Sequence, residues 1–584
     1  MAAVVSGARF AIKTLTLAPL SANVTCLCDK IFANGSVSEL KIVGSNLEDI
    51  EEHAFDASPP VRLQTLILKD ARLAQLPRAV GKVASLRRLD LEGNRIGEIF
   101  AYTFFGPSKL SYVNLRGNRL DSLAENAFLG LENNLRELIL GDNQFWSFPM
   151  SAVKILKKLQ SLDLAGNVIQ NVTSEPFTKL DALHFLDLSG NLFAAVNRDT
   201  FASMPNLNRL SLASNRIAGV DSGSFDSMHS LETLDLSRNA LSRLHRDTFS
   251  RTSRLVKIDL SHNRLKTVAG VFNNLYALEE IRLNDNLLLA VTEDWFGNAP
   301  SLKTIHLERN VISGIVDDAL QPLKRLSRLY LGQNFLTEVK VSYFRFNVAL
   351  NSLSLDRNHI SAIERGSFKG TPKLRELRLH DNIIREITRE LFSSLSLLSE
   401  LHLQNNKLTT IEPQAFGSLA NLQHLDLTGN RLLKLEDIMM RYPSALRTLH
   451  LDDNRLGSFH RETFSGQTTT EILSLANNKL EKLPAKVFEE LINLFRLNLS
   501  RNRILEIEDL ALVGLHQLRY LDLSFNRLAH LSNLTLRGLQ QAEQGRLSFI
   551  QENTITRSCK MNHDLKCVVL KTTVLLNHCL GRSE

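Results

Sequence analysis

One pattern of apolar and polar positions recurs along most of this chain. A complete copy consists of Leu374, Leu377, Leu379, Asn382 and Ile384. The asparagine position recurs nineteen times, from Asn94 to Asn526, and successive copies are 24 residues apart except for one step of 25 and one of 23. The alternating L-x-L core places its leucines on one side of a short strand and the intervening residues on the other. A single short strand cannot bury a leucine row, so the pattern predicts copies stacked in parallel around a continuous apolar core.

An asparagine and a phenylalanine complete each copy. The asparagine follows the strand, and its amide offers two N–H donors and a carbonyl acceptor to the backbone of neighbouring turns. Left unpaired in the interior, such a group costs roughly 1–3 kcal/mol. Ten residues after the asparagine, fourteen of the 29 phenylalanines fall in a single register. We therefore expect stacked rings to pack the outer arc of each copy, and we assign none of them to a ligand.

The register of the copies defines three regions. Residues 36–540 form an array of about 21 copies, residues 1–35 form an N-terminal lead and cysteine-containing cap, and residues 541–584 form a worn last copy and a cysteine-containing C-terminal cap. No insertion longer than one residue interrupts the array between Ala71 and Asn526. We therefore expect no linker, hinge or lid, and each copy should be a strand, a turn and an irregular or briefly helical outer arc.

The 24-residue copy with phenylalanine on its outer arc resembles the typical class of leucine-rich repeat. Similar arrays occur in the ectodomains of Toll-like receptors, in chaoptin-type adhesion proteins and in the acid-labile subunit that carries insulin-like growth factors. The resemblance implies an α/β solenoid, a horseshoe with a concave parallel β-sheet and an irregular convex side packed by phenylalanine. One such scaffold serves many partners, so the resemblance is specific for the fold.

All the cysteines lie near the two ends of the chain: Cys26, Cys28, Cys559, Cys567 and Cys579. Terminal groups of this kind are typical of disulfide-bonded caps, which form in an oxidising compartment. The two ends are too far apart to bridge one another. At least one C-terminal thiol is therefore left over or bonded to another chain, and ordinary buried thiols remain the alternative.

The signals for secretion are mixed. N-glycosylation sequons stand at Asn23, Asn34, Asn171, Asn498 and Asn533, about as many as chance would place in this composition. Met1–Ala22 has apolar patches, but Arg9 and Lys13 interrupt them, so the apolar region of a signal peptide is poorly formed and an incomplete start is one explanation. No run of 18 apolar residues predicts a spanning helix.

Composition and motifs exclude several functions. The net charge of +7, from 69 basic and 62 acidic residues, is small for this length, so we expect no nucleic-acid partner. The sequence contains no G-x-S-x-G, H-E-x-x-H, phosphate-binding loop or C-x-x-C motif. We therefore expect neither catalysis nor a cofactor, and protein binding through the exposed face of the sheet becomes the expected function.

The residues four positions before each asparagine form one row on that exposed face. The row is acidic from Asp163 to Asp259, where solubility and turn bonding offer an alternative explanation, and basic and aromatic from Arg282 to Arg378. We expect this second stretch to bind an acidic or mixed protein surface, with Tyr330 and Arg378 as anchors. The full set of expected partner-binding residues is Arg282, His306, Arg328, Tyr330, Arg378, His380, His402, Asp426 and His450.

Three histidines form a diagonal on the same face. His380, His402 and His424 lie two, four and six residues before consecutive asparagines. Asp426 falls between His402 and His450 in the main row, and a carboxylate so placed should raise the pKa of the imidazoles. The pattern fits a pH-dependent binding patch, a surface zinc site or an ordinary polar surface. We expect no resident metal, and the three histidines are the candidates if one binds.

These observations favour an extracellular or cell-surface module that recognises a protein ligand or another cell-surface protein through its concave face. Cell adhesion, growth-factor carriage and innate immune sensing all fit such a module. The alternative is an intracellular leucine-rich repeat scaffold or regulator without disulfides, and homodimerisation also stays open. A glycan on Asn498 would block the C-terminal third of the concave face and leave the middle of the array to the partner.

Overall fold

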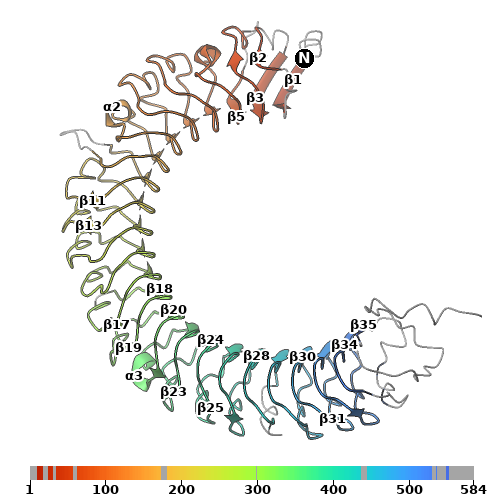
Figure 1. Cartoon of the computed structure of the whole chain (residues 1–584). Coiled ribbons are helices and arrows are strands. Elements are labelled where there is room, and N and C mark those ends of the chain that lie inside the picture. The colour runs from red at the N-terminus through yellow and green to blue at the C-terminus, as the bar shows by residue number, and fades with distance from the viewer. Residues whose placement is uncertain are drawn as a thin grey trace, which may run out of the picture. The chain divides into compact units, whose positions relative to one another are not determined.

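A computed structural model describes residues 10–17, 24–29, 35–56, 62–172, 180–297, 299–435, 444–528, 535, 539 and 548–550. The chain divides into two compact units. The first comprises Met1–Leu287 with Gly297–Ala299, and the second comprises Leu288–Phe296 with Pro300–Glu584. Each unit is a stack of coils, one repeat to a coil, with a parallel sheet along one side (Figure 1).

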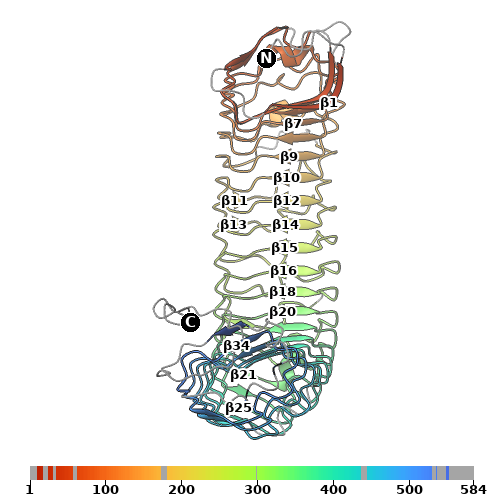
Figure 2. The same cartoon turned by 90° about the vertical axis from the view of Figure 1, so that its right-hand side faces the viewer.

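The main sheet of the first unit grows by one parallel strand per repeat. Figure 2 shows strands from β7 to β16 stacked like rungs. In spatial order, the strands are β1 (Phe10–Leu17), β3 (Gly35–Val43), β5 (Thr65–Lys69), β6 (Arg88–Asp90), β7 (Tyr112–Asn114), β8 (Glu137–Ile139), β9 (Ser161–Asp163), β10 (Phe185–Asp187), β12 (Arg209–Ser211), β14 (Thr233–Asp235), β15 (Lys257–Asp259) and β16 (Glu280–Arg282).

The second unit repeats this arrangement. Its main strands, again parallel and in spatial order, are β18 (Thr304–His306), β20 (Arg328–Tyr330), β22 (Ser352–Ser354), β24 (Glu376–Arg378), β26 (Glu400–His402), β28 (His424–Asp426), β29 (Thr448–His450), β30 (Ile472–Ser474), β32 (Arg496–Asn498), β34 (Tyr520–Asp522) and β35 (Ser548–Ile550). The last strand falls in the worn copy that the sequence placed after Asn526.

Short elements lie outside the main sheets. In Figure 2, β11 and β13 lie on the opposite side of the coil from β10 and β12. The parallel two-residue pairs are β2 (Cys26–Leu27) with β4 (Asp49–Ile50), β11 (Ala195–Val196) with β13 (Gly219–Val220), β17 (Ala290–Val291) with β19 (Gly314–Ile315), β21 (Glu338–Val339) with β23 (Ala362–Ile363), β25 (Glu386–Ile387) with β27 (Thr410–Ile411), and β31 (Lys482–Leu483) with β33 (Glu506–Ile507). Among the described residues, helix is limited to η1 (Arg78–Lys82), α2 (Met150–Val153) and α3 (Val341–Phe344).

Leucines stack on leucines inside each coil. Parallel pairing of β24 with β26 sets Leu377 beside Leu401, and both side chains are fully buried. The flanking residues of each three-residue strand point to the other side of the sheet. This continuous apolar core confirms the predicted leucine-rich solenoid, although its outer arcs are turns far more often than helices.

The asparagine amides link the coils to one another. The Nδ2 group of Asn382 donates to the carbonyl of Leu379 in its own coil, at 3.0 Å, and to that of Leu355 in the coil before, also at 3.0 Å. Its Oδ1 accepts the N–H of Ile360 in the preceding coil at 2.9 Å. The same contacts recur at Asn118 and Asn430. One buried side chain therefore pairs several backbone groups that the turn leaves open.

Phenylalanine rings pack the turns of the outer arc. Phe104 and Phe128 are fully buried one repeat apart, with ring centroids 5.7 Å apart and nearly parallel planes. Phe392 stacks in the same way between Phe368 and Phe416, at 6.3 and 6.2 Å. The rings therefore fill successive outer arcs as the leucines fill the inner side.

The termini add one strand that the repeat pattern did not predict. Strand β1 pairs in parallel with β3 and so covers the first edge of the sheet. Cys26 and Cys28 are free thiols. Cys559, Cys567 and Cys579 lie outside the described residues, so the predicted disulfide-bonded caps stay a prediction.

Replacing Asn382 by alanine should lower the free energy of unfolding by roughly 2 kcal/mol, because it leaves the buried N–H of Ile360 unpaired. It also removes one of the two amide bonds that the carbonyls of Leu355 and Leu379 each accept. The matched control is Asn421→Ala. That exposed amide donates a single bond, to the Ser396 carbonyl at 2.7 Å, and its loss should change stability by less than about 0.5 kcal/mol. Urea unfolding of the two variants beside the parent measures both values. Equal losses in the free energy of unfolding would show that the buried amide contributes no more to stability than the exposed one.

Candidate functional site

The exposed side of the sheet carries two rows of side chains, at the first and third position of every strand. In the first unit, the acidic part of the third-position row bonds to the backbone. The carboxylates of Asp187, Asp235 and Asp259 accept the N–H two residues further on, at 2.8, 2.9 and 2.9 Å. These aspartates therefore hold the turn after the strand, which is the alternative explanation that the sequence left open.

Arg282, in β16 of the first unit, is surrounded by carboxylates. Its Nε donates to Glu280 Oε1 at 2.7 Å, and its Nη1 lies 3.8 Å from Asp259 Oδ2. Lys257 shares the same Glu280 carboxylate at 3.1 Å. Two carboxylates therefore lie close to the Arg282 guanidinium within its own unit, and its expected role in partner binding stays a prediction.

The second unit presents a pair of stacked rings on the exposed face of its own sheet. The rings of His306 and Tyr330 stack with centroids 4.7 Å apart and planes 17° apart. His306 Nδ1 lies 3.2 Å from Glu308 Oε1. Arg328, at the first position of the strand that ends in Tyr330, donates from Nη2 to Thr304 Oγ1 at 2.9 Å. Each of these side chains is therefore held in place by a neighbour in the preceding coil or in its own.

Arg378 follows two strands further along. Its guanidinium donates from Nε to Glu376 Oε1 at 2.6 Å, and the other oxygen of that carboxylate accepts from Ser352 Oγ at 2.8 Å. The side chain remains 47% exposed. Its orientation is fixed, and part of its fork still faces solvent.

The predicted histidine diagonal is a row of four rings. Centroids lie 6.4 Å apart between His380 and His402, 5.2 Å between His402 and His424, and 5.6 Å between His424 and His450. His380 Nδ1 also lies 2.8 Å from Asp381 Oδ2. The register of the asparagines thus brings together histidines that are far apart in sequence.

The predicted rise in the pKa of the imidazoles beside Asp426 is wrong for His402. Burial, followed by the positive charge of Arg378, lowers the pKa of His402, although Glu400 and Asp426 oppose the shift. Asp426 fails to dominate because it is engaged elsewhere, accepting the N–H of Thr428 at 2.9 Å. Desolvation disfavours a charged imidazole more than one shared carboxylate favours it.

His424 shows the same shift for a second reason. Burial lowers its pKa, and the neighbouring rings of His402 and His450 lower it further because each would repel a second charge. Protonation of the two central rings is therefore less favourable than that of a free imidazole.

The possible metal ligands that lie close together are not the three histidines that the sequence predicted. Within the described ranges, the ligand atoms that cluster are those of Glu376, Glu400 and His402, which lie within 4.8 Å of one another. His402 Nε2 is buried and makes no hydrogen bond. Arg378 already occupies Glu376, so a divalent cation would have to displace a guanidinium. The two glutamates stand six residues before their asparagines, in the row that also holds Arg328 and His424, and the sequence analysis did not single them out.

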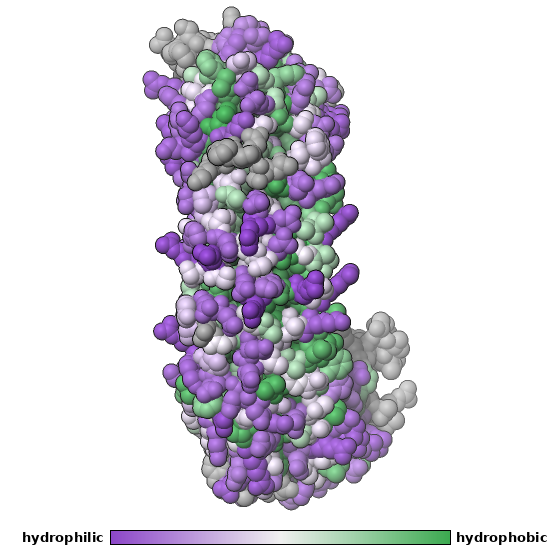
Figure 3. Space-filling view, turned by 90° about the vertical axis from the view of Figure 1, so that its left-hand side faces the viewer, coloured by the Kyte–Doolittle hydropathy of each residue, from purple (hydrophilic) through white to green (hydrophobic). Residues whose placement is uncertain are grey.

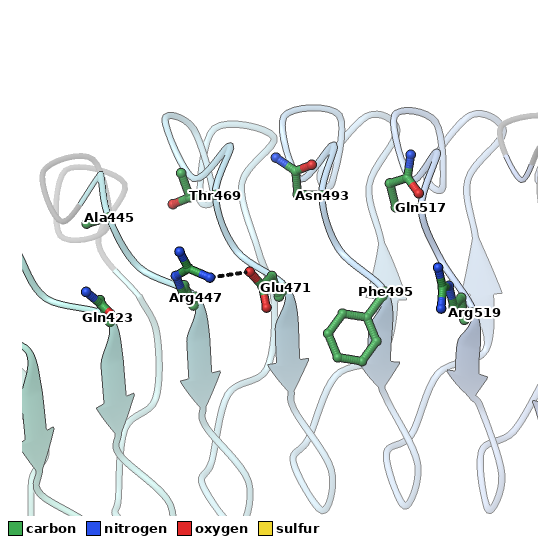
Figure 4. A pocket seen from close by; sticks show the side chains of 9 residues that line it. All are labelled: Gln423, Ala445, Arg447, Thr469, Glu471, Asn493, Phe495, Gln517 and Arg519. Carbon is green, nitrogen blue, oxygen red and sulfur yellow. Dashed lines mark hydrogen bonds and ion pairs between the residues drawn. The ribbon is translucent and has the colours of Figure 1, made fainter.

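A groove outside the predicted face lies at the upstream edge of the second unit's sheet. Figure 4 shows Arg447, Glu471, Phe495 and Arg519 where successive strands begin, with polar side chains of the preceding loops beyond them. The cavity measures about 680 Å³, and an ion pair of 3.0 Å joins Arg447 to Glu471. Phe495 is half-buried, and apart from it and Ala445 the lining residues are polar. Nothing in the L-x-L pattern marks this edge, because its residues precede the strand.

The opposite surface lacks comparable organisation. In Figure 3, hydrophobic residues appear in small groups scattered among hydrophilic ones. Of the expected glycosylation sites, Asn23, Asn34 and Asn533 lie outside the described residues. Asn498 is half-exposed in β32, and its Oδ1 accepts the Ser500 N–H at 3.1 Å. Asn171 is exposed in a loop.

A family model described as "Leucine rich repeat" matches residues 84–133, 133–193, 183–241, 205–265, 229–288, 277–336, 324–384, 372–432, 444–504 and 492–544. These matches cover most of the chain, and the chain belongs to the leucine-rich repeat family. Members of this family and the receptor ectodomains of similar fold are non-catalytic recognition modules. No helix among the described residues has both the length and the apolar character needed to cross a bilayer.

Individual relatives match parts of the array. Toll-like receptor 9 of Felis catus is 35% identical over 97 residues, which is 16% of this chain and 9% of that protein. Leucine-rich repeats and immunoglobulin-like domains protein 3 of Homo sapiens is 33% identical over 150 residues, 25% of this chain and 13% of the relative. The matched segments are thus a small part of each relative's length.

A solved structure of the Drosophila Toll–Spatzle complex, in its glycosylated form, has a similar fold. Its TM-score is 0.66 at 20% sequence identity, and the match covers 93% of this chain and 69% of that one. Together with the receptor relatives, this match confirms the predicted resemblance to Toll-type leucine-rich arrays.

The histidine row should make stability depend on pH. Because the folded pKa of His402 and His424 lies below the unfolded value of about 6.5, the unfolded chain binds more protons in this range. The part of the free energy of unfolding that depends on the neutral rings of His402 and His424 is present above about pH 6.5 and is lost as the pH falls below that value. A His402→Gln/His424→Gln variant should therefore lose less thermal stability than the parent between about pH 7 and pH 5.

Thermal unfolding midpoints across this pH range give the comparison. The exposed His516, replaced by glutamine, serves as the matched control and should leave the pH dependence of the parent unchanged. If the double variant shows the same pH dependence of thermal stability as the parent, the lowered pKa of His402 and His424 is contradicted.

Proposed function

We propose that this chain is an extracellular or cell-surface recognition module that binds a protein partner through the exposed sheet face of its second unit. The face runs from His306 to His450 and includes Arg328, Tyr330, Arg378, His380, His402 and Asp426. The observation that carries the proposal is the fixed geometry of its large side chains, above all the stacked His306–Tyr330 pair.

Fixed side chains favour binding because a partner does not have to order them. Immobilising a rotamer-rich side chain on association costs about 0.5–1.5 kcal/mol. Tyr330 is restrained by its ring contact and Arg378 by Glu376 before any partner arrives. Tyrosine and arginine are also among the residues most enriched in binding hot spots. The two anchors thus combine suitable chemistry with little remaining freedom.

The charge of the face points to an acidic or mixed protein surface. Arg328 is exposed and bonded to a neutral hydroxyl, so no carboxylate in that contact compensates its charge. Arg378 shares one carboxylate and keeps part of its fork in solvent. A partner carboxylate that approaches Arg378 could form a charge-assisted pair with the free part of the fork.

The relatives support a role outside the cell. Toll-like receptor 9 is a receptor by name, and the Toll–Spatzle complex is described as a molecular hub in Drosophila development and innate immunity. Adhesion, growth-factor carriage and immune sensing are the biological settings we propose for this chain. Homodimerisation through the same face is a further form that such binding could take.

Binding should depend on the two anchors. A Tyr330→Ala/Arg378→Glu variant should lose at least about tenfold in affinity for a partner found among purified secreted and cell-surface ectodomains, because it removes the ring stack and reverses the exposed charge. Surface plasmon resonance against the captured ectodomain measures the change.

The matched control is Arg365→Glu, an exposed arginine in a turn of the outer arc with the same charge reversal. It should bind as the parent does. If the control weakens binding as much as the double variant, the sheet face is not the binding surface.

The glycosylation state of the chain tests its proposed extracellular location independently of the binding experiment. Material made by the native host should migrate faster after N-glycosidase treatment, because Asn171 is exposed in a loop and available for modification. An Asn171→Gln variant should show a smaller shift. Unchanged mobility of the untreated and treated chains, together with no difference between reducing and non-reducing gels, would favour the intracellular scaffold.

A further inference from the structure

A row of cations lies along the downstream edge of the second unit's sheet. The residue directly after the asparagine is basic in six consecutive repeats: Lys407, Arg431, Arg455, Lys479, Arg503 and Arg527. All but the half-buried Lys407 are exposed. We call this set the basic ladder. It lies on the opposite edge from the groove in Figure 4, because groove residues precede the strands and ladder residues follow them.

Backbone hydrogen bonds fix the ladder in register. The N–H of Arg455 donates to the carbonyl of Leu432 in the preceding coil at 2.9 Å, and the N–H groups of Lys479 and Arg503 make the same bond one and two coils further on. Neighbouring strands of a sheet are about 4.8 Å apart, so the row from Lys407 to Arg527 spans roughly 24 Å. The solenoid therefore presents evenly spaced positive charges in a line.

The ladder cations stand outside the ion pairs of the described residues. None of the ion pairs found among the described residues involves a member of the basic ladder, although such pairs are common elsewhere on the second unit, as between Lys482 and Glu508 at 2.7 Å. The acidic residue that lines the same cavity as the ladder is Asp453, whose Oδ1 accepts from the Asn477 amide. Cations therefore outnumber carboxylates along this edge.

The ladder also borders a concave surface. A cavity of about 490 Å³ is lined by Arg455, Lys479, Arg503 and Arg527 together with Arg501, and Asp453 is its acidic residue. The other lining residues are asparagines, of which Asn454, Asn478 and Asn502 are the buried repeat asparagines and Asn477 is exposed. Charge and shape thus coincide on this edge.

The repeat does not require a cation at this position. In three earlier copies, the residue directly after the asparagine is apolar: Leu287, Val311 and Phe335. The side chains of Leu287 and Phe335 are 42% and 49% exposed. Since apolar residues are tolerated there, folding alone does not explain six successive cations. Earlier copies mix the two kinds, as with Arg216, Ala240 and Arg264, so the distinguishing feature of the ladder is its unbroken run of six cations.

We propose that the basic ladder binds a linear sulfated polysaccharide. Arginine and lysine pair with the oxyanions of such a chain through charge-assisted hydrogen bonds, and a regular line of cations matches a regular line of anions. Single-stranded nucleic acid is the competing polyanion, but proteins that bind it interleave cations with aromatic platforms for the bases. Phe525 is the aromatic beside this row in the described chain, and Arg501 already lies over its ring at 5.3 Å.

This inference goes beyond the proposed function, since it concerns a different surface and a different class of ligand. It also does not depend on it, because a partner could bind the sheet face whether or not the edge binds a glycan. The two surfaces would permit the chain to hold a protein ligand and a polysaccharide at the same time.

The test uses the full chain and heparin oligosaccharides of defined length. An Arg455→Gln/Lys479→Gln/Arg503→Gln variant should bind immobilised heparin at least about tenfold more weakly near 150 mM salt and show a shallower salt dependence. Affinity should rise with oligosaccharide length until a fragment spans the ladder. A second variant, Arg431→Gln/Arg527→Gln, which removes ladder cations on either side of those three, should also weaken binding.

The matched control is Arg365→Gln/Lys369→Gln/Lys373→Gln, which removes the same net charge from exposed residues outside the ladder. It should bind as the parent does, and thermal unfolding confirms that every variant is folded. Equal losses in the triple variant and the control would overturn the ladder as a site. Binding of desulfated heparin as tight as that of heparin, or tighter binding of oligo-dT of equal charge, would overturn the assignment to a sulfated polysaccharide.

Discussion

The structure depends on one side-chain amide, repeated once per coil. The amide of Asn382 bonds to three carbonyls and one N–H, and two of these four backbone groups belong to the coil before. These contacts tie the turn after every strand to its neighbour, so the strands stay in register. The register in turn decides which side chains become neighbours on the exposed face. Function on this scaffold is therefore a consequence of how far each residue stands from its asparagine.

That dependence explains what the sequence could predict. The spacing alone placed the leucine core, the parallel strands and the phenylalanine register, because each follows from the distance to the asparagine. The same counting brought the four histidines together, and the ring distances agree with it. It did not anticipate β1, whose sequence lacks the repeat signature and whose pairing comes from the open edge of the sheet.

The pKa shifts and ion pairs could not be predicted from the residue spacing in the same way. Asp426 stands between His402 and His450 in the row, yet its carboxylate bonds to the turn, and burial dominates the pKa of the ring beside it. Arg282 looked like the start of a basic stretch, but Glu280 and Asp259 surround it. Both outcomes depend on side-chain directions and neighbours in three dimensions. The glutamates of the first strand position were within reach of the sequence, since alternation places them on the same face.

The central claim is that the exposed sheet face of the second unit is where a protein partner binds. Hydroxyl-radical footprinting of the chain, alone and saturated with the captured ectodomain, tests it most directly because it reports side-chain exposure. The account predicts protection of Tyr330, His306 and His402 in the complex. Protection confined to outer-arc residues such as Tyr102 and Phe105, with Tyr330 oxidised as fast as in the free chain, would contradict it.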